Sequence, residues 1–276
     1  MNYMLNALTI DLEDWYHICG EGEYSDPAKW YEYEDRVTRN TEKIFTILDA
    51  HNCKATFFVL GYIAEKNPSL IKRIYNEGHE VGVHGYYHRR VFEMTRAEFE
   101  EDLRRSIAVV EEITNAPVLG YRAPEWSIRK DTLWAYDIMS KCGLKYDSST
   151  VPLTRMGDRG FKKFPHRVET SCGSIMEFPL TTCRCLWENL PFTGGLPLRI
   201  VPYWFVLNKI RRINRSRRPA MVYIHPWEFD ESQPKINLPL SRRFMHYFNI
   251  RSTRPKIEGI LNHLKFAPTR EVLGLC

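Results

Sequence analysis

Two histidines four residues apart, His84 and His88, are the residues whose types and spacing most clearly suggest chemistry. They directly follow an alternating apolar segment, residues 81–83, that is typical of a short buried strand. A loop that leaves a strand can direct both imidazoles toward one point, and imidazole is a common metal ligand. Surface or capping histidines are the alternative for this spacing alone. A catalytic metal site would need a third protein ligand, usually a carboxylate.

Ionisable residues also follow three other apolar segments. An acidic run occupies residues 11–14, Arg122 follows the segment 118–121, and His225 follows the segment 220–224. Because catalytic residues of parallel α/β folds gather at the carboxyl ends of strands, we expect these groups to share one cleft with the histidine pair. One carboxylate and two histidines suit a divalent metal, while a second carboxylate and a further histidine can act as general base and general acid. Each residue taken alone could instead serve as a cap, a core hydrogen-bond partner or an ordinary ion-pair partner.

Strand-like and helix-like segments alternate along the chain, which predicts parallel strands with crossover helices, in a barrel or a doubly wound sheet. The expected strands are 5–11, 54–60, 81–83, 118–121, 144–147, 220–224 and 265–268. The expected helices are 37–50, 68–76, 95–114, 131–141, 204–213, 240–249 and 256–264. The pattern loosens between 149 and 202, where we expect an irregular insertion with one possible strand at 174–178. No repeat or clear linker divides residues 1–276, which favours a single domain.

Composition excludes few classes of protein but narrows the choice of partners. The 43% hydrophobic and 26% charged residues are ordinary for a globular protein. Much of the net charge of +5 lies in 209–218, and without interleaved aromatic residues this run favours a solvated helix end over a nucleic-acid site. No apolar run approaches the roughly 20 residues of a spanning helix, and residues 1–8 do not resemble a signal peptide. We therefore expect a cytoplasmic protein with no nucleic-acid partner and no membrane span.

The order of the motifs resembles the polysaccharide deacetylases of carbohydrate esterase family 4, the chitooligosaccharide deacetylase homology domain. The resemblance covers residues 5 to about 150 and about 219 to 230. A subgroup linked to bacterial exopolysaccharide and exosortase loci is similar at residues 11–16, 122–124, 194–195, 199, 202–203 and 225–229. The resemblance implies a deformed (β/α) barrel of seven strands. It also implies hydrolysis of N-acetyl groups on an N-acetylated glycan, the expected partner.

The resemblance implies a metal site for one divalent ion, with zinc expected and cobalt or nickel as alternatives. His84 and His88 match the family's metal-binding histidines. The metal-binding carboxylate is expected at Asp14, displaced by two inserted residues from its usual place next to the base aspartate. Glu13 is the alternative, because it shares strand parity with Asp11.

The catalytic residues implied by the resemblance are Asp11, Arg122 and His225. Asp11 matches the general base, Arg122 the arginine that pairs with the base, and His225 the general acid. The family's usual aspartate partner for the acid histidine is not evident in this sequence, and Asp131 and Asp147 are the candidates considered.

Four further residues are expected to contact the substrate. The backbone N–H of Glu125 would help to stabilise the oxyanion, and Tyr223 stands where the family lines its acetyl pocket. Trp126 and Trp227 adjoin motifs and could either stack on sugar rings or only pack. His17 is expected to be an exposed loop residue rather than an extra ligand.

Two other functions remain as alternatives. One is a metal-independent amide hydrolase of the wider superfamily, and the retained pair His84 and His88 argues against it. The other is a catalytically inactive carbohydrate-binding or scaffold protein of polysaccharide biosynthesis. The retained Asp11, Arg122 and His225 argue against that function.

Overall fold

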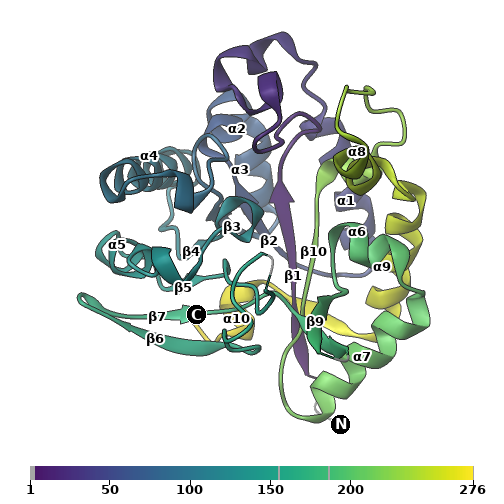
Figure 1. The fold of residues 1–276 in the computed structure, drawn as a ribbon. Coiled ribbons are helices and arrows are strands. Elements are labelled where there is room, and N and C mark those ends of the chain that lie inside the picture. The colour runs from purple at the N-terminus through teal and green to yellow at the C-terminus, as the bar shows by residue number, and fades with distance from the viewer. Residues whose placement is uncertain (1–3, 155, 186, 276) are drawn as a thin grey trace.

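The structure is a computed structural model that describes residues 4–154, 156–185 and 187–275 (Figure 1). Within these residues its centre is a nine-stranded sheet. Its strands are β1 (Leu5–Leu12), β2 (Thr56–Val59), β3 (Glu80–Val83), β4 (Gly120–Tyr121), β5 (Tyr146–Asp147), β6 (His166–Thr170), β7 (Gly173–Glu177), β10 (Met221–Ile224) and β11 (Lys265–Ala267). Their order is β10-β1-β2-β3-β4-β5-β7-β6, and β11 pairs with the beginning of β1.

Helices surround this sheet (Figure 1). They are α1 (Val37–Ala50), α2 (Gly61–Lys66), α3 (Pro68–Asn76), α4 (Arg96–Thr114), α5 (Ala135–Lys141), α6 (Gly195–Ile200), α7 (Tyr203–Arg215), α8 (Leu240–Tyr247), α9 (Thr253–His263) and α10 (Thr269–Val272). The helix expected from residue 95 has its predicted capping box, in which the Thr95 side chain accepts from the Glu98 N–H and Glu98 bonds back to Thr95. The alternation of strands and helices confirms the predicted α/β class.

All the strands from β10 to β7 run parallel, and this places their carboxyl ends at one edge of the sheet. β1 lies between β10 and β2, pairs with β11 as well, and is buried from its second residue onward. Every residue of β2, β3 and β10 is also buried. Strands covered on both faces read as continuous apolar runs, which is why the sequence identified them.

The sheet does not close into a complete barrel by strand pairing. No ladder between β10 and β7 or β6 occurs in the part of the chain that the structure describes. An extended segment fills the gap: the Met221 N–H donates to Thr181 Oγ1 (2.8 Å) and the Tyr223 N–H to the Thr193 carbonyl (3.1 Å). Within the described residues the main sheet contains nine strands, whereas a barrel of seven was predicted, and the seven from β10 to β7 form the parallel run.

The segment 149–202 is more regular than the sequence predicted. It forms the hairpin β6–β7 and a second hairpin of β8 (Thr182–Cys185) and β9 (Glu188–Pro191), and then begins α6. β7 joins the main sheet beside β5, so the segment extends the sheet rather than only covering its end. β6 contains no fully buried residue, and this weak apolar pattern of an edge strand explains why it was not expected.

Candidate active site

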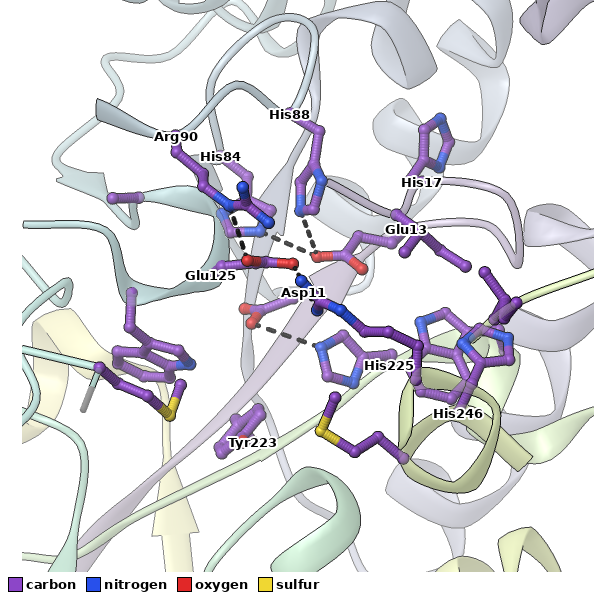
Figure 2. A pocket seen from close by; sticks show the side chains of 18 of the residues that line it. Asp11, Glu13, His17, His84, His88, Arg90, Glu125, Tyr223, His225 and His246 are labelled. Carbon is purple, nitrogen blue, oxygen red and sulfur yellow. Dashed lines mark hydrogen bonds and ion pairs between the residues drawn. The ribbon is translucent and has the colours of Figure 1, made fainter. Parts of the chain in front are cut away.

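The carboxyl ends of the parallel strands open onto a cavity of about 650 Å³ (Figure 2). Asp11 lies near the end of β1, and Glu13 follows that strand. His84 directly follows β3, and His225 directly follows β10. Together with His88, all these side chains line the cavity, so the fold brings together groups that the sequence placed at separate strand ends.

Glu13, His84 and His88 form the tightest cluster in this cavity. Glu13 Oε1 lies 3.0 Å from His84 Nε2 and 2.9 Å from His88 Nε2, and all three side chains are buried. The His84 Nδ1–H donates to the Arg122 carbonyl oxygen at 2.7 Å, so a neutral His84 presents an Nε2 lone pair to the carboxylate. Two such acceptors repel unless a cation or a proton lies between them. This donor set fits a divalent transition metal.

A left-handed turn aims the second histidine of this cluster. His88 has φ +52°, a conformation that residues other than glycine seldom adopt. The Cys19 thiol lies 3.1 Å from the His88 carbonyl oxygen and 3.2 Å from its Nδ1. These contacts hold the ring with Nε2 toward Glu13.

The expectation that Asp14 supplies the metal-binding carboxylate does not fit the structure. Asp14 Oδ1 accepts from the Trp15 N–H (2.8 Å), and Oδ2 accepts from the N–H groups of Arg36 (2.6 Å) and Val37 (2.9 Å). These bonds tie Asp14 to the start of α1, and burial raises its pKa to about 7 against the lowering effect of the same bonds. Glu13, the alternative considered from the sequence, follows β1 in a tight turn in which its N–H donates to the Asp11 carbonyl (2.9 Å), and its side chain lines the cavity with that of Asp11.

A buried arginine holds Asp11. Arg122 Nη1 donates to Asp11 Oδ1 (2.5 Å) and to Thr9 Oγ1 (2.8 Å), and Nη2 donates to Ser148 Oγ (3.0 Å). The guanidinium also lies over the Phe58 ring at 4.2 Å. Arg122 is fully buried, so its charge is compensated almost entirely by Asp11 and these hydrogen bonds.

On the other side of the cavity, Glu228 and Arg199 form the support of His225. His225 Nδ1 lies 3.0 Å from Glu228 Oε2, and His225 Nε2 lies 3.9 Å from Asp11 Oδ2. Glu228 Oε1 forms an ion pair with Arg199 Nε at 3.2 Å, without the alignment of a hydrogen bond, and both side chains are buried. Burial disfavours the charged form of His225, but Glu13, Glu228 and Asp11 outweigh it and raise the His225 pKa to about 9.

Neither aspartate considered as the partner of His225 holds it. Asp147 ends β5 and bonds to Ser149, and Asp131 is exposed on a short 3-10 helix. The sequence did carry a signal for Glu228. It lies three residues after His225, in the spacing of a capping box with a proline at the first helical position, and the 3-10 helix Pro226–Phe229 forms there.

The expected substrate-binding residues all line the cavity. Trp126 meets Tyr223 edge to face, with ring centroids 5.3 Å apart. Glu125 and Trp126 have φ +50° and +55°, so this turn is held in a left-handed conformation beside the cavity. The Trp227 ring stacks on both His225 and His246, with centroids 5.0 Å and 4.4 Å apart, so it packs between histidines at the wall of the cavity.

Sequence reasoning missed three arginines that line this cavity, Arg90, Arg129 and Arg242, and misplaced one histidine. Glu125 Oε2 accepts from Arg90 Nε (2.8 Å), and Glu125 Oε1 accepts from Arg242 Nη1 (3.3 Å). His17 is buried rather than exposed, lines the cavity and accepts the Asp14 N–H at Nδ1 (2.8 Å). Arg90 follows the His-x3-His motif by two residues, but nothing near Arg242 in the sequence indicated its place.

Two family models match adjoining parts of the chain. The polysaccharide deacetylase family matches residues 22–146, and a domain of unknown function, DUF3473, matches residues 148–274. A peptidoglycan-N-acetylglucosamine deacetylase of Bacillus cereus is 45% identical over 86 residues, which cover 31% of this chain and 29% of the relative. A peptidoglycan deacetylase of Helicobacter pylori is 32% identical over 109 residues, which cover 40% of this chain and 36% of the relative. The chain thus spans only about a third of the length of these curated relatives.

Solved structures show the same fold. The crystal structure of a candidate polysaccharide deacetylase from Mycobacterium smegmatis superimposes with a TM-score of 0.65 at 20% identity, over 99% of this chain and 90% of the other. A peptidoglycan N-acetylglucosamine deacetylase superimposes with a TM-score of 0.53 at 18% identity, over 98% and 88%. Among the described helices, none combines the length and apolar character needed to cross a bilayer. Residues 22–146 are thus similar to the polysaccharide deacetylase family, and the described chain shares the fold of these deacetylase structures.

Proposed function

We propose that this protein is a metal-dependent hydrolase that removes N-acetyl groups from an amino-sugar glycan. The observation that carries the proposal is the position of Glu13 Oε1, within 3.0 Å of both His84 Nε2 and His88 Nε2, in a cavity that Asp11 and His225 also line. His84 and His88 lie in the first matched segment, His225 lies in the second, and Asp11 and Glu13 precede both, so we propose residues 1–276 as one catalytic domain.

Glu13, His84 and His88 would hold one divalent ion, for which zinc is the expected choice given one carboxylate and two imidazole ligands. Such an ion, when bound, polarises a carbonyl group and lowers the pKa of water toward about 7. The His84 Nδ1–H bond to the Arg122 carbonyl fixes the tautomer that leaves Nε2 free for this role.

Two proton transfers fall to side chains of this chain. Asp11 accepts a proton from the attacking water, and Arg122 orients the Asp11 carboxylate through its Nη1–H bond to Oδ1. His225 donates a proton to the leaving amine nitrogen, and Glu228 fixes the orientation of its ring through Nδ1. Since Asp11 Oδ2 and His225 Nε2 are 3.9 Å apart, both can reach atoms of one amide group.

The remaining groups receive the substrate. The Glu125 backbone N–H would donate to the oxyanion, and one such donor is typically worth about 2.7–4 kcal/mol. Trp126 and Tyr223 form an aromatic wall suited to an acetyl group, and Trp227, whose ring stacks on His225 and His246, would contact a sugar only at the part of its ring that lines the cavity. The products would be acetate and a free amino sugar.

An N-acetylated amino-sugar polymer is the substrate class that the names of the curated relatives favour. The motifs at 194–203 and 225–229 direct the proposal toward bacterial exopolysaccharide biosynthesis. The cytoplasmic location expected from the sequence stays a prediction.

The test combines metal analysis with an acetate-release assay on chitooligosaccharides and exopolysaccharide fragments. Metal is measured by plasma mass spectrometry on protein purified without a His-tag. We expect one divalent ion per wild-type chain. We expect none in Glu13→Gln or His84→Ala, and turnover lost in both. The matched control is Asp14→Asn, an adjacent carboxylate that the structure ties to backbone N–H groups, and it should keep its metal.

Other outcomes would contradict the proposal in different ways. Acetate release by protein that takes up no zinc, cobalt or nickel after dialysis would support a metal-independent amide hydrolase. Glycan binding without acetate release at any metal loading would support an inactive binding protein. Loss of metal in Asp14→Asn but not in Glu13→Gln would restore the assignment made from the sequence.

A further inference from the structure

The outer side of α8 carries a cluster of exposed apolar side chains. Leu240 is 85% exposed, Phe244 47% and Phe248 41%. Leu240, Phe244 and Phe248 are spaced four residues apart, so they follow one side of the helix and its end. The Phe244 and Phe248 rings have centroids 4.5 Å apart. We call Leu240, Phe244 and Phe248 the α8 patch.

The inner side of α8 is firmly attached to the protein. His246 is buried, and its Nε2 lies 2.8 Å from Gln233 Oε1. The buried Arg199 donates to the carbonyl oxygens of Met245 (2.5 Å), His246 (3.0 Å) and Phe248 (2.9 Å). Because these contacts fix the backbone, the α8 patch is held outward on an ordered helix.

The sequence around the α8 patch is strongly basic. Residues 232–257 contain no aspartate or glutamate. Their cationic residues are Lys235, Arg242, Arg243, Arg251, Arg254 and Lys256. Arg242, Arg251 and Arg254 pair with carboxylates outside this segment. Lys235 and Arg243 are exposed, and neither forms an ion pair with any described carboxylate.

The α8 patch lies beside the opening of the cavity. Met245 and His246 of the same helix line the cavity, as do Arg242 and Leu238. Figure 1 shows α8 next to the tip of β1, and Figure 2 shows the helix that carries His246 close to His225. Whatever binds the α8 patch therefore comes to rest at the entrance of the catalytic cavity.

We propose that the α8 patch docks on the surface of an anionic lipid bilayer. A helix with Leu and Phe on its outer side and Lys and Arg next to them has the character of an interfacial membrane anchor. Exposed cations near the surface add attraction to anionic headgroups. If the proposed function holds, the substrate is then a glycan presented at the membrane surface.

Charge distinguishes the bilayer from a second copy of the chain. A symmetric dimer through the α8 patch would bring two basic segments against each other, because such an interface joins the same surface of both copies. Like charges at short distance oppose that contact. An anionic surface complements the same residues.

The test is co-sedimentation of the full chain with phosphatidylcholine vesicles, with and without phosphatidylglycerol. We expect wild-type protein to bind only the vesicles with phosphatidylglycerol and to be released by high salt. The double variant Leu240→Ser/Phe244→Ser should bind at least about tenfold more weakly, because it loses two apolar side chains that would be buried in the bilayer. Trp187→Ser is the matched control. Trp187 is 81% exposed next to β9, far from residues 240–248 in the sequence, and its loss should leave binding unchanged.

Three results would overturn the docking proposal. In the first, wild-type protein stays in the supernatant with both kinds of vesicle. In the second, Trp187→Ser loses as much binding as the double variant. In the third, sedimentation velocity shows a dimer that Leu240→Ser/Phe244→Ser abolishes. Acetate release from a soluble substrate is measured separately and should be equal in wild type and the double variant. Vesicle binding without any acetate release would therefore reject the proposed function but keep the docking site.

Discussion

The two sides of the cavity each use a buried arginine to position a reactive group. On one side the arginine contacts that group directly, and on the other it acts through a glutamate. On the base side, Arg122 contacts Asp11 directly. On the acid side, His225 is held by Glu228, and Glu228 in turn meets Arg199. Both arginines are fully buried, so both sides depend on a charged pair that water does not screen.

The two sides also come from different parts of the chain. Asp11 and Arg122 belong to β1 and to the end of β4, whereas His225, Glu228 and Arg199 all lie within the segment matched by DUF3473. The second segment therefore contains His225, the proposed general acid, together with Glu228 and Arg199. Neither matched segment contains all the residues that line the site, which supports the proposal that residues 1–276 form one domain.

Replacing Arg122 by alanine should have the largest effect of any change to either side. It leaves Asp11 buried without its cation, and breaking such a pair typically costs about 3–5 kcal/mol of unfolding free energy. Chemical denaturation measures this loss, and acetate release should fall with it. The double variant Arg122→Ala/Asp11→Asn removes the orphaned charge and should recover part of the stability. If the double variant is no more stable than Arg122→Ala, the Arg122–Asp11 ion pair does not account for the lost unfolding free energy.

Asp11→Asn and His225→Gln compare the two reactive groups directly. Each should lower kcat by about 10²–10⁴-fold, the usual contribution of a general base or acid. Metal content and the unfolding midpoint should stay near wild type. If Asp11→Asn also lost its metal, the roles of Asp11 and Glu13 would have to be exchanged.

Glu228→Gln tests the support of the acid. The substitution keeps an acceptor oxygen for His225 Nδ1 but removes the charge of a charge-assisted hydrogen bond, worth about 1.5–3 kcal/mol. We expect kcat to fall about 10–100-fold with KM unchanged. Glu228→Ala should be more severe. Equal kcat in wild type and Glu228→Gln would show that His225 does not need the negative charge of Glu228 for turnover.

Arg199→Lys should have the smallest effect on turnover. Lysine keeps the charge but cannot reach several backbone carbonyls at once as the planar guanidinium does. Unsatisfied buried carbonyls should lower the unfolding free energy by about 1–3 kcal/mol, while kcat falls less than in Glu228→Gln. A fall in kcat greater than that of Glu228→Gln, without loss of stability, would place Arg199 nearer to the chemistry than its contacts indicate.

Local sequence patterns determined the α/β class and the ionisable residues that end the strands. Buried parallel strands are continuous apolar runs, and the charged residues that interrupt them, such as Asp11 and His225, are visible from sequence alone. The hairpin β6–β7 was only partly foreseen, because its edge strand is half exposed and its apolar alternation is weak.

Only the tertiary structure places the Glu13 carboxylate beside His84 and His88 and the Asp14 carboxylate at the start of α1. The two are adjacent carboxylates, and what separates them is the direction of each side chain as the chain leaves β1 and passes the start of α1. The contacts of Arg199 with Glu228 and with α8 could not be predicted from the sequence either, because they join residues about 30 to 50 positions apart. Sequence spacing reports neighbours along the chain, whereas charge pairing and exposure are properties of the packed molecule.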